Sequence, residues 1–187
     1  GWIGGFTSTP VRWVLAGALL LGAVWSTPLG GFTVDAAEVA TGQRAWADYL
    51  ARERRYNYRD YDLTDQRQLV EHLRSTTRPT DRVLVWAFDP AIHIWAQRRG
   101  VTRFLYNYPF RVDWGNPAYE AELMEGLRAT PPEVIVIARG DHTYGVTGNR
   151  KDSERLFHEL RPFRAFVLEG YERETVKGRY TVWRRKR

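Results

Sequence analysis

The chain has 187 residues, no Cys and a formal net charge of +6. The length suits one domain, or one domain with an appendage, and 43% apolar residues argue against global disorder. The missing Cys excludes a disulfide scaffold, a thiol nucleophile and a Cys-ligated zinc site. Four of the positive charges are the last four residues, Arg184 to Arg187. The rest of the chain is only mildly basic and carries no recognition motif, so we expect no nucleic-acid partner.

The first element along the chain is an apolar segment. Trp13 to Trp25 carries no charge, and the uncharged stretch continues to Val34. About 20 mostly apolar residues are needed to cross a bilayer, and residues 13–32 supply them. Arg12 precedes the run and no further basic residue follows until Arg44. By the positive-inside rule, the N-terminal end lies in the cytoplasm and the bulk of the chain lies outside it.

Residues 1–34 are therefore predicted to be a transmembrane segment with flanks, set in a plasma or inner membrane with the lipid bilayer as partner. Two other interpretations stay open. One is a cleaved signal peptide with a small-residue site near Ala36, which gives the same extracytoplasmic location to the rest. The other is a buried core helix, because the strictly apolar run is only thirteen residues long.

Residues 35–61 are predicted to be a juxtamembrane connector. Arg and Tyr alternate in it between Arg54 and Tyr61, which suits a membrane-proximal surface or an ordinary helix end whose Tyr side chains pack on the next domain. From Asp62 the pattern becomes regular. Residues 62–187 are predicted to form a soluble extracytoplasmic α/β domain.

Strands and helices alternate in this domain. Helices are expected after Asp65, Asp89, Asn116 and Asp152, residue types that cap helix N-termini; the second would end at Gly100 and expose His93. A loop is expected over residues 140–150, and a hairpin over residues 171–185. Strands are expected at Val83–Phe88, Val101–Tyr106, Glu133–Ala138 and Ala165–Leu168, each an apolar run.

This alternation indicates βαβ units with right-handed crossovers. The expected fold class is α/β: a small Rossmann-like sandwich with a mostly parallel sheet and an antiparallel C-terminal hairpin, preceded by one transmembrane helix.

Three candidate site residues follow the expected strands, where ligands bind in open α/β sheets. Asp89 follows the first strand and is either an acid or base or, as we favour, the cap of the next helix. Asp141 and His142 follow the third strand and are either a functional pair or part of a polar loop. One His beside one Asp does not make a metal site, and the nearby glycines fit neither a dinucleotide fingerprint nor a P-loop.

The richest cluster is Arg103 to Arg111, with two guanidinium groups and four aromatic rings. Arg103, Tyr106 and Arg111 could hold a phosphate or the face of a sugar. The alternative is a strand whose rings pack the core while its Arg side chains reach solvent. No spacing rule separates the two.

The order of segments resembles the C-terminal end of polytopic GT-C-type membrane glycosyltransferases, in the protein mannosyltransferase and aminoarabinose transferase group. An apolar segment and a polar connector are followed by a helix over residues 65–73. The motifs that carry the resemblance are Asp81–Trp86, Arg103–Tyr106, Pro131–Ile137 and Tyr180–Arg184.

The resemblance implies a polyprenyl-phosphate sugar donor, an extracytoplasmic acceptor and catalysis by acidic residues of an early loop, often with a divalent metal. That region is not in this sequence. The implied role is a non-catalytic portion with no cofactor of its own and no catalytic residue to carry over. The alternative function is a membrane-anchored or secreted α/β binding module without catalysis.

Overall fold

The computed structural model describes residues 37–42, 45, 48 and 62–187, which belong to two compact units, 1–52 and 53–187. Residues 37–40 of the first unit are helical. None of the helices within the described ranges is long and apolar enough to cross a bilayer. The predicted transmembrane segment, residues 1–34, lies outside the described residues, as does most of the predicted connector.

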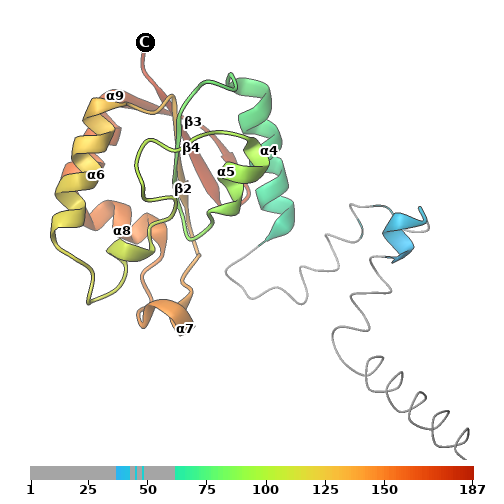
Figure 1. The fold of residues 1–187 in the computed structure, drawn as a ribbon, viewed down its shortest axis with the longest axis horizontal. Helices are drawn as coiled ribbons and strands as arrows, with labels where there is room; N and C mark the ends of the chain where they lie inside the picture. The colour runs from blue at the N-terminus through green and yellow to red at the C-terminus, as the bar shows by residue number, and fades with distance from the viewer. Residues whose placement is uncertain (1–36, 43–44, 46–47, 49–61) are drawn as a thin grey trace, which may run out of the picture. The chain divides into compact units, whose positions relative to one another are not determined.

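In the second unit, residues 62–187 form the predicted α/β fold around a four-stranded sheet (Figure 1). The strand order is β1-β2-β4-β3, and β1 and β2 form its one parallel pair. β4 lies antiparallel to both β2 and β3. The sheet is therefore mixed, and the mostly parallel sheet of the prediction is wrong. The strands are β1 (Val83–Trp86), β2 (Val134–Ala138), β3 (Tyr171–Lys177) and β4 (Tyr180–Arg185).

Helices cover both faces of the sheet, which confirms the sandwich. Because successive side chains of a strand point to opposite faces, Val83 and Val85 join one core and Leu84 and Trp86 the other. The first core includes α4 (Leu63–Thr76) and α5 (Ala91–Ala96). The second includes α6 (Ala118–Ala129), α8 (Ser153–Glu159) and α9 (Arg161–Gly170).

The strand predicted at Val101–Tyr106 does not form. Its backbone is irregular. Among the described residues, the only strand-like pairing nearby is an isolated bridge between Arg82 and Arg99. The rings of this segment pack on one another and on the second core instead, with Phe104 buried between Phe110 and Tyr119. A short 3-10 helix, η1 (Tyr108–Phe110), follows.

The strand predicted at Ala165–Leu168 is also wrong, because these residues lie within α9. Pro162 stands in the first turn of that helix, where its missing N–H costs nothing, so it begins a helix rather than ending one. Phe163 and Val167, four residues apart, are the buried pair of this helix. Of the run Ala165–Leu168 only Val167 is buried, as expected where consecutive residues turn around a helix.

Several helix boundaries also differ from the prediction. Asp62, not Asp65, caps α4 by accepting hydrogen bonds from the backbone of Thr64 and Asp65. α5 ends at Ala96, where Gln97 adopts a left-handed conformation, rather than at Gly100. The loop after β2 contains a short helix, α7 (Tyr144–Thr147). The predicted hairpin is confirmed as β3 and β4.

Candidate functional site

Asp89 lies just beyond the end of β1, where its carboxylate is buried between α4 and β4. Its Oδ2 accepts a hydrogen bond from Nε2 of Gln66 at 2.5 Å and from the hydroxyl of Tyr180 at 3.1 Å. Pro90 occupies the cap position of α5 without a side-chain bond, but the Asp89 carboxylate bonds to the backbone of Ala91, the first residue of α5, as a helix cap does. Asp89 therefore joins three elements, and its role is broader than the helix cap favoured from the sequence.

Burial raises the pKa of Asp89 above its ordinary value, and the hydrogen bonds from Tyr180 and Gln66 offset part of this rise. The nearby carboxylate of Asp141 adds to the rise. Burial likewise raises the pKa of Tyr180, and its Asp89 partner adds to that effect. A carboxyl group with a raised pKa can hold a proton, but the Asp89 carboxylate is already bonded to Gln66 and Tyr180 of the same domain.

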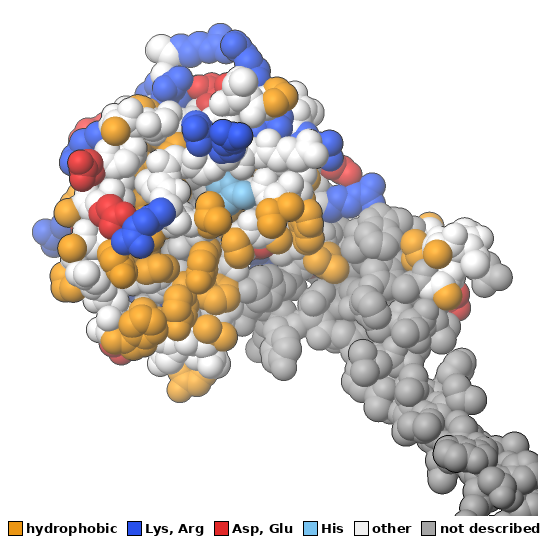
Figure 2. Space-filling model, viewed as in Figure 1, with side chains coloured by type: hydrophobic (Ala, Val, Ile, Leu, Met, Phe, Trp, Pro, Cys, Tyr) orange, Lys and Arg blue, Asp and Glu red, His pale blue; other side chains and the backbone are white. Residues whose placement is uncertain are grey.

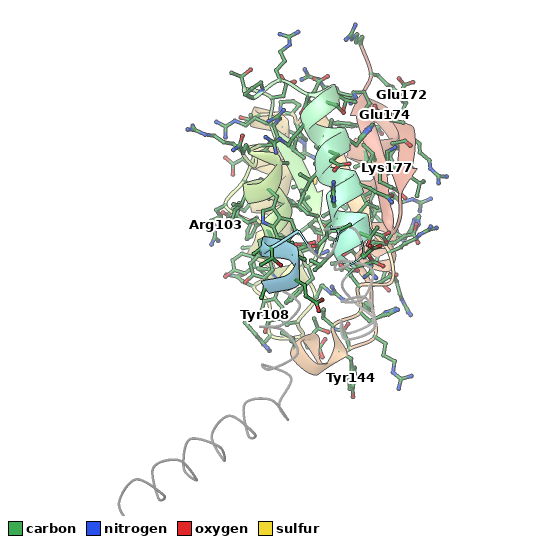
Figure 3. All side chains as sticks on the ribbon, turned by 90° about the vertical axis from the view of Figure 1, so that its right-hand side faces the viewer. Arg103, Tyr108, Tyr144, Glu172, Glu174 and Lys177 are labelled. Carbon is green, nitrogen blue, oxygen red and sulfur yellow. The ribbon has the colours of Figure 1, made fainter. Side chains whose placement is uncertain are left out.

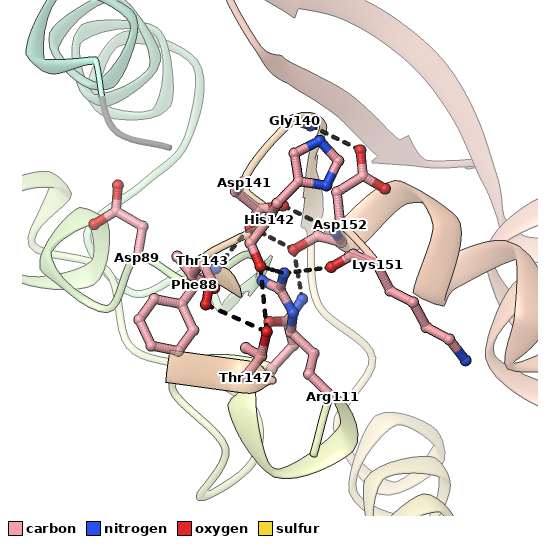
Figure 4. Close-up of polar contacts among 12 residues, drawn as sticks. Phe88, Asp89, Arg111, Gly140, Asp141, His142, Thr143, Thr147, Lys151 and Asp152 are labelled. Atoms are coloured by element: carbon pink, nitrogen blue, oxygen red, sulfur yellow. Dashed lines mark hydrogen bonds and ion pairs between the residues drawn. The ribbon is translucent and has the colours of Figure 1, made fainter. Parts of the chain in front are cut away.

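Asp141 and Arg111 form a second buried group at the end of β2 (Figure 4). The Arg111 guanidinium lies 3.6 Å from Oδ2 of Asp141, and its Nη2 donates to the carbonyl oxygens of His142 and Lys151 at 2.7 and 2.5 Å. Asp141 also accepts from the backbone N–H of Phe88 at 3.0 Å. These bonds tie η1, β1 and the loop after β2 together.

Ser153 and Asn107 complete this group, and no sequence motif points to either residue. Ser153 donates through its backbone N–H and its hydroxyl to the two oxygens of Asp141, at 2.8 and 2.6 Å. Its hydroxyl also accepts from Nδ2 of Asn107 at 2.6 Å. Both residues are almost fully buried. Each stands beside a residue that is easier to interpret: Tyr108 belongs to the aromatic cluster and Asp152 to a helix start. Nothing in the local sequence therefore marks Asn107 or Ser153.

His142 stands apart from this buried group although it follows Asp141 directly. Its side chain is exposed, and its Nδ1 bonds to the carbonyl of Arg150 at 2.9 Å. The pair predicted from the sequence thus separates into a buried carboxylate and a loop side chain. His93, expected on an exposed helix face, is buried and bonds through Nδ1 to the carbonyl of Arg98.

Arg103 and Tyr106 belong to a different surface from Arg111. Arg103 is exposed and makes a two-pronged ion pair with Glu122, at 2.5 and 2.8 Å, beside the rings of Phe104 and Tyr119. Tyr106 stacks with Tyr108, whose ring meets Trp114 edge-on. The structure therefore divides the predicted Arg and aromatic cluster into a buried anchor and an exposed surface.

The exposed part surrounds a shallow hollow of about 250 Å³. In Figure 3, Arg103 and Tyr108 lie along the same side of the domain. Apolar groups dominate the lining, which consists of Arg103, Phe104, Leu105, Tyr106, Tyr108, Pro109, Trp114 and Tyr119. This hollow is open to an external partner, whereas Asp89, Asp141 and Arg111 are buried and bonded within the domain.

Within residues 62–187 and the shorter described stretches, no three His, Asp or Glu side chains gather as metal ligands would. No protein-family model matches the chain, and no curated protein is similar enough to it to count as a relative.

Proposed function

We propose that this chain is the C-terminal, non-catalytic portion of an integral membrane glycosyltransferase. That enzyme would move a sugar from a polyprenyl-phosphate donor to an extracytoplasmic acceptor. Its catalytic residues, and any divalent metal, would belong to another part of the same protein. The apolar segment Trp13 to Trp25 would anchor this portion, and residues 62–187 would lie outside the cytoplasm.

The observation that carries the proposal is the way the candidate acid and base groups are used. Asp89 and Asp141 stand where an α/β enzyme holds its ligand, yet each is buried and bonded to other residues of the domain. Gln66, Tyr180, Ser153 and Arg111 account for both carboxylates without a substrate. A structural role for both supports a domain that assists chemistry performed elsewhere.

The resemblance to GT-C-type glycosyltransferases gives the proposal its reaction class. Three of the four quoted motifs lie in strands: Asp81–Trp86 includes β1, Pro131–Ile137 includes most of β2, and Tyr180–Arg184 lies in β4, whereas Arg103–Tyr106 is irregular. These strands are neighbours in the sheet. The resemblance therefore involves residues that are adjacent in space as well as ordered in sequence.

A second candidate is a membrane-anchored or secreted binding module without any catalytic partner segment. The aromatic hollow favours it, because exposed rings around a concave surface can bind a ligand without chemistry. The two candidates differ in what the gene encodes before Gly1.

Reading the coding sequence upstream of Gly1 separates the candidates. The glycosyltransferase proposal expects several further apolar spans and an early extracytoplasmic loop with acidic residues. A start codon immediately before Gly1 would refute it and leave the binding module.

A further inference from the structure

The described part of the domain exposes an unusual group of large apolar side chains. Ile94 and Trp114 are each 75% exposed, and Trp95, Leu105, Tyr144 and Val146 are 45–59% exposed. Soluble monomers rarely expose contiguous apolar patches of this kind without a partner. Leu168 of α9 is also 46% exposed. We call the six others the apolar face; it consists of Ile94, Trp95, Leu105, Trp114, Tyr144 and Val146.

Short contacts connect the segments that carry the apolar face. Leu105 and His93 both lie beside Gly100, which links α5 to the following loop. Tyr108 contacts Trp114 in the same hollow. Arg111, one residue after η1, bonds to the carbonyl of His142 just before α7. Figure 2 shows hydrophobic side chains gathered over the lower front of the domain.

Much of this face lies at the end of the sheet where the chain enters the domain. α4 begins at Leu63, and its first turns contact groups beyond the ends of β1 and β2: Gln66 bonds to Asp89, and Asp65 accepts from the backbone of Arg179. α7 follows the end of β2, and the backbone N–H of Asn107, just before η1, donates to the carbonyl of Ala87 at the end of β1. The entry point of the chain and the lower part of the apolar face are therefore neighbours.

The sequence before this entry point supplies a reason for a membrane partner. The uncharged run ends at Val34, and the residues from there to Asp62 can span about 100 Å at most. A domain tethered to a bilayer at this distance meets the lipid surface at high effective concentration. Even weak attraction of an exposed apolar face then suffices for contact.

We propose that the apolar face docks on the interfacial zone of the lipid bilayer. Trp and Tyr are favoured there, because their rings are apolar while their N–H and O–H groups stay hydrated. Trp95, Trp114 and Tyr144 supply such rings, and Ile94 and Val146 supply aliphatic groups that enter deeper. The Arg150 guanidinium lies over the Tyr144 ring, 5.9 Å from its centre, and in this docking it would face the lipid headgroups.

A sugar fits this face less well than a lipid surface does. Sugar sites combine a ring with several hydrogen-bonding groups aimed into the same space, and the hollow beside Trp114 is lined mainly by apolar groups. Arg103, the charged residue of that hollow, already directs Nε and Nη2 to Glu122. The aliphatic side chains of Ile94 and Val146 cannot form hydrogen bonds with sugar hydroxyl groups.

The inference rests on the membrane attachment within the proposed function, and fluorescence tests it in the full chain. Because the chain has no Cys, Trp114→Cys, Tyr144→Cys and Glu172→Cys each give a single labelling position for an environment-sensitive dye. Glu172 is the control, since it is exposed on β3 and lies far from Tyr108 and Tyr144 in Figure 3. Each labelled chain is reconstituted into vesicles that contain headgroup nitroxide lipids, and iodide is the aqueous quencher.

We expect the lipid nitroxide to quench the dye at positions 114 and 144 at least twofold more than at position 172, with the reverse order for iodide. Equal iodide quenching at all three positions would overturn the proposal, because the face would then be free. Protection from both quenchers at positions 114 and 144 would also overturn it, in favour of a protein contact. Carbonate extraction of the vesicles tests attachment itself, so its failure is distinguishable from failure of docking.

Discussion

Asp89 shows how a single buried carboxyl group can shape the pH dependence of the domain. Its folded pKa is raised, mainly by burial. Between the unfolded pKa near 4 and the higher folded pKa, the folded state binds more protons than the unfolded state. The free energy of unfolding therefore falls as pH rises through this window. At neutral pH the buried, ionised carboxylate still lowers the stability of the folded domain.

Asp89→Asn is expected to remove this decline. The difference in unfolding free energy between variant and wild type should grow in favour of the variant as pH rises from about 4 to 7. Thermal unfolding of the full chain in detergent, followed by tryptophan fluorescence across that range, measures it. Other titrating groups, including His93, whose pKa burial lowers, cancel in the comparison. Parallel curves for the two proteins would contradict the assignment.

Asp89→Ala is the matched control for that experiment. It removes the titrating group as well, but it leaves the amide of Gln66 and the hydroxyl of Tyr180 without their acceptor. Relative to Asp89→Asn, we expect a loss of about 1–3 kcal/mol at every pH, the usual cost of unpaired buried donors.

Arg111→Ala should destabilise the domain strongly. The Arg111 side chain is fully buried, and its removal leaves the Asp141 carboxylate and two carbonyl oxygens short of a donor. Loss of one partner from a buried ion pair costs about 3–5 kcal/mol. Arg111→Lys should recover only part of this, because an ammonium cannot reproduce the fork of the guanidinium. Urea unfolding of the full chain in detergent measures both, and a loss below about 1 kcal/mol in Arg111→Ala would contradict the role.

At the scale of elements, the loop that carries Trp114 depends on one glycine. A Cβ on Gly115 would collide with the backbone carbonyl of Pro109, so the loop must shift to accept any side chain. Gly145, in α7, has open space around its added Cβ and is the control.

We expect Gly115→Ala to lower the melting temperature and to change the fluorescence of Trp114, while Gly145→Ala leaves both nearly unchanged. Fluorescence-detected melting of the two variants decides this. If Gly115→Ala behaved like Gly145→Ala, the tight turn after η1 would be wrong.

The elements that the sequence predicts best are those with one unambiguous period. β1 and β2 are short apolar runs between turn residues, α6 has a regular stripe at Leu123, Met124 and Leu127, and the final hairpin has a clear turn. The failures come from short apolar runs, in which strand and helix look alike. At Ala165–Leu168 the deciding contact is Phe163 with Val167 in the second core, which local sequence does not reveal.

The candidate site was predictable only in part. The positions of Asp89 and Asp141 beyond neighbouring parallel strands follow from the alternation of elements, and the structure places both there. Their partners Gln66, Tyr180 and Ser153 come from α4, β4 and α8, elements far apart in sequence. The insertion of β4 beside β2 brings Tyr180 to Asp89, and no local pattern predicts that strand order.

At the scale of the whole molecule, internal pairing uses much of the basic charge at the C-terminus. Arg184 pairs with Glu174, Arg185 pairs with Glu133, and Lys186 donates to the carbonyl groups that end α9. These contacts fasten the hairpin to its neighbours. The basic residues at the C-terminus therefore help to hold the edge of the sheet in place. The apolar face on α5, α7 and the Trp114 loop says more about an external partner than this charge does.

We propose that residues 62–187 assist sugar transfer without performing its chemistry. The most direct measurement is transfer by membranes that contain the whole encoded protein, supplied with radiolabelled polyprenyl-phosphate hexoses and pentoses. We expect transfer to the acceptor fraction, retained within about threefold in Asp89→Asn and in His142→Ala. Absence of transfer from every donor, or a hundredfold loss in either variant while it remains folded, would contradict the account.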